Sequence, residues 1–117
     1  NTDFFITDKT FADFCGLSVG ENHSTEVYVL KATVKVVETA YYTNINLVNG
    51  FDDIMLYCSS ASQYNWLKAY AGQEITIEIA PCNWNDKKDE YRGCVLAVVN
   101  EDGTKVYNTL NFDTYSK

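Results

Sequence analysis

The sequence predicts a single, mainly β domain, and three observations lead to this expectation. The chain has 117 residues, the usual size of one domain with one hydrophobic core. Several segments alternate apolar and polar residues with the period of two that is typical of strands. The composition is 46% hydrophobic with one proline and six glycines, which fits neither a disordered nor a low-complexity chain. We therefore expect residues 1–117 to form one folded unit without a linker.

The N-terminal residues 1–25 are expected to contain a short helix and a loop outside the main sheet. Apolar side chains in Asp8–Leu17 follow helical spacing, Asp8 is suited to cap the first turn, and Gly16 lies near the end. Residues 18–25 are polar, contain a glycine and lack periodicity, which indicates a connecting loop.

The main sheet is expected over residues 26–100 and begins with one long strand. Glu26–Thr39 is rich in β-branched residues, which favour strands. The alternation of apolar residues changes phase near Lys31 and Ala32. A β-bulge inserts one unpaired residue and so explains such a change, and we therefore expect a bulged strand.

The next two segments predict a β-hairpin. Tyr42–Val48 and Phe51–Cys58 both alternate apolar and polar residues, and Asn49-Gly50 between them is a strong turn signal. The aliphatic side chains of the two segments share one face, which we expect to point into the core. The opposite face carries Asn44, Asn46, Asp53, Met55 and Tyr57.

A helix is expected after this hairpin. Ser59–Ser62 offers an N-cap, apolar residues follow at helical spacing through Tyr70, and Gly72 is suited to end the helix.

Two further strands and an added third one complete the chain. Gln73–Ala80 alternates isoleucines with polar residues, and Pro81 is expected to stop this strand. Pro81–Arg92 is polar and is predicted to be a long loop. Gly93–Val99 is apolar on both faces, as expected of a strand that is covered on both sides. After an Asp-Gly turn, Thr104–Phe112 is expected to pair back as an added strand.

This order of elements resembles the oligonucleotide/oligosaccharide-binding (OB) fold. The resemblance covers about residues 26–100 and rests on the element order, on the long first strand, and on Trp66-Leu67 followed by Gly72–Ile75. It implies a five-stranded Greek-key barrel with a helix between strands three and four. The N-terminal helix and the C-terminal strand, over residues 101–117, are additions to that pattern.

Four cysteines, at positions 15, 58, 82 and 94, bear on the redox compartment of the protein. None forms a C-x-x-C pair, and four cysteines in a short acidic chain indicate two disulfides of a secreted or cell-surface protein. Buried free thiols are the alternative interpretation. The count leaves three connectivities open. With the OB topology we expect Cys15 to pair with Cys58, and Cys82 with Cys94 at the base of the loop before the fifth strand.

Charge and motifs argue against catalysis and against strong binding to a phosphate backbone. Nine Lys and Arg against 16 Asp and Glu give a net charge of -7, which repels nucleic acid. The single histidine, His23, lies in a predicted loop, and the sequence contains no nucleophile-elbow, phosphate-loop or zinc-protease motif. We therefore expect no enzymatic activity and no cofactor.

Two acidic stretches have the residue types of calcium ligands. Asp52-Asp53 follows a turn of the kind that uses Asn and Asp for conformational reasons, and residues 86–90 interleave three acids with two lysines. A hairpin turn and a solvated charged loop explain both stretches, so we expect no metal site.

The OB resemblance also implies a ligand face across strands two and three, between the loop after strand one and the loop after strand four. Aromatic rings there could stack on sugar rings or bases, and amides could bond to hydroxyls or base edges. Alternatively, these tyrosines merely suit an exposed strand, and Trp84 packs on the end of the barrel. The candidate residues are Tyr41, Tyr42, Asn44, Asn46, Met55, Tyr57, Trp84, Tyr91 and Arg92.

The functional expectation is a non-catalytic accessory module of a larger secreted or cell-surface bacterial protein. Tyr57–Ser60 and Ala80–Asn85 look like OB-like modules of secreted bacterial proteins, including extracellular nucleases. The chain opens at Asn1 without Met or a signal sequence, as a mature or excised fragment does. The aromatic and amide face would bind a glycan or a neighbouring domain of the parent chain. A single-stranded nucleic-acid-binding module, or a spacer without a ligand, are the alternatives, and no membrane insertion is expected.

Overall fold

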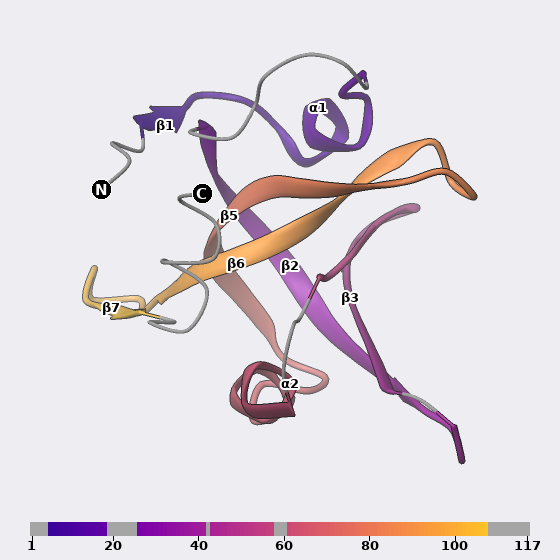
Figure 1. Cartoon of the computed structure of the whole chain (residues 1–117). Coiled ribbons are helices and arrows are strands. Elements are labelled where there is room, and N and C mark those ends of the chain that lie inside the picture. Colours follow the sequence, from indigo (N-terminus) through magenta and orange to yellow (C-terminus); the bar gives the residue numbers. More distant parts are fainter. Residues whose placement is uncertain (1–4, 19–25, 42, 58–60, 108–117) are drawn as a thin grey trace.

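The computed structural model describes residues 5–18, 26–41, 43–57 and 61–107, and these residues form a mainly β structure, as predicted. The elements are β1 (Phe5–Thr7), α1 (Phe11–Cys15), β2 (Glu26–Glu38), β3 (Thr43–Asn49), β4 (Asp52–Met55), α2 (Ala61–Lys68), β5 (Glu74–Asn85), β6 (Glu90–Val99) and β7 (Lys105–Tyr107). All of these strands belong to one sheet with the order β4-β3-β2-β5-β6-β7, and β1 pairs with β2 (Figure 1). The β1–β2 pairing is parallel and the other strand pairings are antiparallel.

The described strands form an open sheet and do not close into a barrel. The two strands that would have to meet are β4 and β6, and they approach each other at one isolated parallel bridge between Leu56 and Gly93. The backbone N–H of Tyr57 donates to the carbonyl of Gly93 at 2.8 Å in the same place. Among the described strands, this bridge and this hydrogen bond join the two edges of the sheet at one point only.

Strand β2 is the central strand of the sheet. Tyr28–Thr33 pairs with β5 and Thr33–Glu38 pairs with β3, so that Thr33 is paired on both sides. Both ladders run along β2 without a register shift, and the predicted bulge in this strand is wrong. The apparent phase change arises because Val27 and Val29 are apolar residues on the face opposite the main core, where Val27 is buried in a second cluster. Tyr28 and the alternate residues after it point into the main core.

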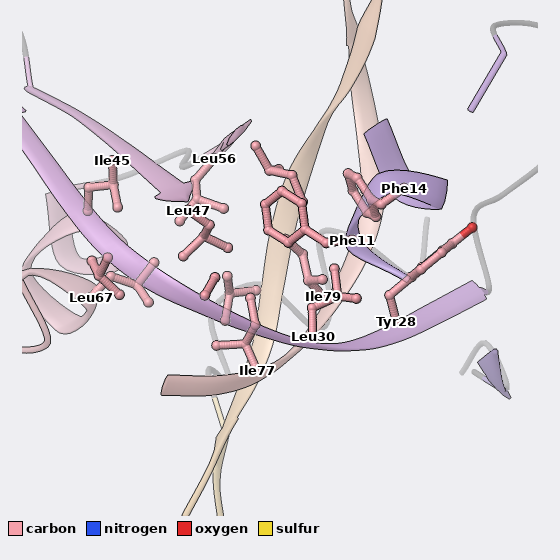
Figure 2. Packing of buried hydrophobic residues seen from close by; sticks show 14 of the residues in the cluster. Phe11, Phe14, Tyr28, Leu30, Ile45, Leu47, Leu56, Leu67, Ile77 and Ile79 are labelled. Atoms are coloured by element: carbon pink, nitrogen blue, oxygen red, sulfur yellow. The ribbon is translucent and has the colours of Figure 1, made fainter. Parts of the chain in front are cut away.

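The core lies on the concave side of the sheet. It takes every second residue of the strands and is completed by the two helices, as Figure 2 shows. Because side chains alternate across a strand, this arrangement places the polar residues of β3 and β4 outside, as predicted. The fully buried members include Tyr28, Phe14, Ile45, Leu47, Ile54, Leu67, Ile77 and Ile79.

Helix α1 is shorter than predicted and begins at a different cap. Thr10, not Asp8, is the N-cap: its hydroxyl accepts from the backbone N–H of Asp13 at 3.2 Å, and the Asp13 carboxylate accepts from the Thr10 N–H at 2.9 Å. This capping box orients the helix so that Phe14 packs edge-on against Tyr28, with ring centroids 5.1 Å apart. Gly16 ends the helix, as predicted.

The β3–β4 hairpin is confirmed, with its turn one residue later than expected. Asn49 pairs with Asp52, so Gly50 and Phe51 form the two-residue turn. Gly50 has φ +62°, a conformation that glycine adopts without steric cost.

The helix after the hairpin is confirmed as α2, and it leads back to β2. Gly72 has φ +80°, which turns the chain so that its N–H donates to the Val34 carbonyl at 2.8 Å. The N–H of Val34 in turn donates to the carbonyl of Gln73 at 3.0 Å. The chain thus enters β5 already hydrogen-bonded to the central strand.

The loop predicted over Pro81–Arg92 is wrong, because these residues form the arms of a long hairpin. Strand β5 passes through Pro81 to Asn85, and β6 begins at Glu90. Pro81 is tolerated because the pairing of β5 with β2 ends at Ile79, so that further along β5 the only ladder neighbour among the described strands is β6. A register shift between Cys82 and Trp84 absorbs the irregularity, and Asn83 takes a positive φ of 42° there.

The predicted disulfides are absent, since Cys15, Cys82 and Cys94 are not joined to one another or to another cysteine in the structure. Cys82 lies opposite Arg92, and Cys94 lies opposite Ala80, so the two cysteines are diagonal neighbours. Diagonal positions in an antiparallel pair are about 7 to 8 Å apart, beyond the reach of a disulfide.

Two of the cysteines are packed as thiols instead. Cys94 is buried on the side of the sheet opposite the main core, with Val27, Ala80 and Leu96. The Cys15 thiol donates to the Asp53 carbonyl at 3.6 Å, and burial, with neighbouring carboxylates, raises its pKa to about 12. Cys58 lies outside the described residues.

The added C-terminal strand is present over Lys105–Tyr107, where it pairs with β6; the rest of the prediction, to Phe112, lies outside the described residues. Lys105 Nζ reaches across β6 and lies 2.7 Å from Oε2 of Glu78, a buried carboxylate on β5. None of the helices in the described part of the chain is long and apolar enough to span a membrane.

We predict that Gly93→Ala destabilises the protein by about 1 to 3 kcal/mol, because overpacking a tight core has that cost. An added Cβ would lie 2.3 Å from Cδ1 of Ile79 and 3.1 Å from Cγ2 of Ile54. The measurement is the free energy of unfolding in urea. Gly16→Ala is the matched control, since the nearest atom to its added Cβ is 3.5 Å away. Equal stability of the two variants would contradict the claim that the core leaves no room for a side chain at Gly93.

Candidate functional site

The outward surface of β2, β3 and β4 is the candidate site, and we call it the β2–β4 face. The pairing register arranges its side chains in rows, since Lys35 lies opposite Asn46, which lies opposite Met55. The neighbouring row joins Thr33 to Val48 and Val48 to Asp53, and a further pair joins Val37 to Asn44. These residues point away from the core because they alternate with its members. The face consists of Thr33, Lys35, Val37, Asn44, Asn46, Val48, Asp53 and Met55.

Asp53 is the centre of a charged hydrogen-bond network on this face. The amide Nδ2 of Asn46 donates to Asp53 Oδ2 at 2.8 Å, and Lys88 Nζ lies 3.0 and 3.1 Å from the two carboxylate oxygens. Burial alone would raise the pKa of Asp53, but the hydrogen bonds from Lys88 and Asn46 outweigh it and leave the pKa lowered. The network therefore holds an ionised carboxylate beside an amide in a defined orientation.

The tip of the β5–β6 hairpin supplies the cation of this network. Lys88 is also 4.0 Å from Oε2 of Glu90, whose pKa is raised mainly by burial. Asn85 is buried, accepts from the backbone N–H of Lys87 at 3.2 Å, and places its Nδ2 4.0 Å from the sulfur of Met55. These contacts hold the hairpin tip against β4. In Figure 1 the tip of the β5–β6 hairpin lies near the upper end of the β3 ribbon.

An open hollow of about 650 Å³ adjoins the face along β2. Its volume is in the range of small-ligand sites. The backbone bonds between Gly72 and Val34 hold one wall in place. The hollow is lined by Thr33, Val34, Lys35, Val36, Val48, Ala71 and Gly72.

Three of the ligand-binding residues that the sequence predicts lie together on this face: Asn44, Asn46 and Met55. Tyr57 follows at the end of β4, 36% exposed, with its backbone bonded to Gly93. Tyr42 lies outside the described residues. The ligand-binding role of all of them stays a prediction.

The structure separates Trp84, Tyr91 and Arg92, which come from the β5–β6 hairpin, from the face. Trp84 and Tyr91 are opposite each other on the hairpin, with ring centroids 5.1 Å apart and an interplanar angle of 79°. Tyr91 packs against the main core, so this ring pair supports the hairpin. Arg92 alternates to the other side of β6, where its guanidinium donates to Oδ1 of Asn83.

Sequence reasoning missed the residues that complete the site. The period of two that Asp53 shares with Met55 places Asp53 on the outward face, but its position beside a turn also explains it, so the sequence does not predict it as a ligand residue. Lys35 and Thr33 are missed because the register of β2 against β3 is not visible in the sequence. Lys88 comes from the far end of a hairpin that was predicted to be a loop.

The described residues contain no group of three or more His, Cys, Asp or Glu side chains placed to hold a metal ion. The carboxylates of Asp53 and Glu90 instead have the Lys88 ammonium beside them.

No protein-family model matches the sequence, and neither the curated proteins nor the solved structures contain a match to it.

The lowered pKa of Asp53 predicts an acid-dependent contribution to stability. A carboxylate whose pKa falls on folding from the unfolded value of 3.8 stabilises the folded state above that pH. The contribution is lost as the pH decreases through the folded pKa. We expect Asp53→Asn to be less stable than the wild type at neutral pH, with the difference shrinking below about pH 4.

Urea unfolding as a function of pH measures this difference. Asp86→Asn is the matched control, because Asp86 is an exposed acid in the β5–β6 turn that also carries Lys88. A difference for Asp53→Asn that is independent of pH would refute the network's charged character.

Proposed function

We propose that this domain is a non-catalytic binding module and that it binds a glycan through the β2–β4 face. The observation that carries the proposal is the hydrogen-bonded group of Asn46, Asp53 and Lys88 on an outward sheet surface, beside an open hollow. Amide, ammonium and carboxylate groups side by side offer both donors and acceptors, which is the pattern that sugar hydroxyls can use.

The topology supports an OB-type assignment, which we infer as part of the proposal. The order β4-β3-β2-β5-β6, with α2 between β4 and β5, corresponds to the expected strand order of a Greek-key barrel. The parallel bridge from Leu56 to Gly93 lies where such a barrel would close. In OB domains the face of the second and third strands is a ligand surface, and these strands correspond to β3 and β4.

Pre-organisation supports the choice of a polar, uncharged ligand. Asn46 and Asp53 are already bonded to each other, so binding does not have to immobilise them separately. The exposed ring of Tyr57, at the end of β4, is available to stack on a sugar.

The same contacts disfavour single-stranded nucleic acid. Lys88 is paired with Asp53, and Arg92 lies on the far side of the hairpin from Tyr91, so these two cations do not form one basic patch for phosphate groups. The net charge of -7 adds a long-range repulsion of phosphate groups.

The proposal includes the compartment, a secreted or cell-surface bacterial protein. Its basis is the resemblance of Tyr57–Ser60 and Ala80–Asn85 to modules of secreted proteins. The module's place in a larger chain, where a neighbouring domain would be a second partner, is part of the same proposal.

Binding to a glycan array, with labelled single-stranded DNA in parallel, tests the proposed function. We expect glycan binding that changes little with salt and is weakened about tenfold in Asn46→Ala, because one or two hydrogen bonds are lost. Asn65→Ala is the matched control, an exposed amide on α2.

Two other outcomes would reject the proposal. Salt-dependent binding of DNA would identify a nucleic acid, and not a glycan, as the ligand. If the folded protein binds neither the glycans nor the DNA, the domain is a spacer without a ligand of its own.

A further inference from the structure

Two aromatic side chains of this chain are almost fully exposed. Tyr41 is 94% exposed and Phe51 is 109% exposed, the largest values among the large hydrophobic residues of the described chain. Single exposed apolar residues are common on protein surfaces. Tyr41 and Phe51 differ from such single residues because they flank the same strand of the β2–β4 face.

Tyr41 and Phe51 stand at opposite ends of β3, the middle strand of that face. Tyr41 belongs to the connection between β2 and β3, and Phe51 to the turn between β3 and β4. Figure 1 shows these two connections at opposite ends of the β3 ribbon. Seven residues of extended strand span about 23 Å, at about 3.3 Å per residue.

The backbone beside each aromatic makes a defined local interaction. Phe51 follows Gly50 in a two-residue turn between the paired residues Asn49 and Asp52, where Asn, Asp or Gly is usual and a large apolar residue is not. The backbone N–H of Tyr41 donates to the hydroxyl of Thr39 at 3.2 Å. A ring on a fixed turn loses little conformational entropy when a ligand stacks on it.

The face between the two ends mixes apolar side chains, such as Val48 and Met55, with polar ones. Lys35, Asn46 and Asp53 occupy the middle of the face, where they can bond to hydroxyl groups. The surface therefore has hydrogen-bonding groups at its centre and an exposed ring at each end.

We propose, building on the glycan-binding function above, that Tyr41 and Phe51 are terminal stacking platforms and that the ligand is a linear oligosaccharide lying along β3. A single sugar ring is too short to reach both ends of the face, whereas a chain of several rings reaches both. The domain then selects ligands by length, and its partner is a polysaccharide or its longer fragments.

The test is calorimetric titration of the intact protein with cello- and chito-oligosaccharides, each as monomer, trimer and hexamer. We expect the hexamer to bind at least about tenfold more tightly than the monomer. Tyr41→Ala and Phe51→Ala are each expected to weaken hexamer binding about fivefold to tenfold and to leave monomer binding unchanged.

Two control variants separate stacking from other effects. Phe51→Tyr keeps a ring at the turn and should retain hexamer affinity. Tyr107→Ala removes a half-exposed ring on β7, away from the face, and should change nothing.

The outcomes distinguish this inference from the function on which it rests. Equal affinity for all lengths, or Ala variants that bind the hexamer like the wild type, would overturn the length selection while leaving glycan binding through Asn46 intact. Loss of affinity for every length on Asn46→Ala, with the length dependence preserved, supports both proposals. Absence of binding to any glycan would overturn both.

Discussion

Backbone pairing along both edges of β2 is the constraint on which the rest of the structure depends. The strand pairs with β5 over Tyr28–Thr33 and with β3 over Thr33–Glu38, so one residue belongs to both ladders. A shift of one residue in either ladder would turn every core side chain of that strand outward. The register that buries Val34 therefore also points Lys35 to the outside, and the core and the β2–β4 face are two consequences of the same pairing.

The β5–β6 hairpin connects this framework to the candidate site. It is longer than its turn signals indicate, and its length brings Lys88 and Asn85 to Asp53 and Met55 on β4. The aromatic pair of Trp84 and Tyr91 stiffens the arms and anchors them to the core. The charged network on the face is thus held from two sides, by the β3–β4 ladder and by the hairpin tip.

Several element predictions were correct because local physics decides them. The hairpin around Gly50 depends on a turn residue and on alternation, and both are visible in the sequence. The prediction for Pro81 was wrong because the absence of β2 beside that part of β5 is a property of the assembled sheet. The cysteine pairing was wrong for a similar reason: the register sets Cys82 opposite Arg92, two residues away from Cys94, so the two cysteines are diagonal neighbours and not facing residues.

The sequence by itself determined the mainly β class, the hairpin, both helices and the outward placement of Asn44, Asn46 and Met55, because alternation, capping and turn chemistry act over a few residues. Only the tertiary structure decided that Asp53 and Lys88 meet, that Arg92 lies on the far side of the hairpin, and that Tyr41 and Phe51 are exposed at the two ends of β3. These relations join residues that are far apart in the chain, and they depend on strand register and on the length of a hairpin, which local patterns do not encode.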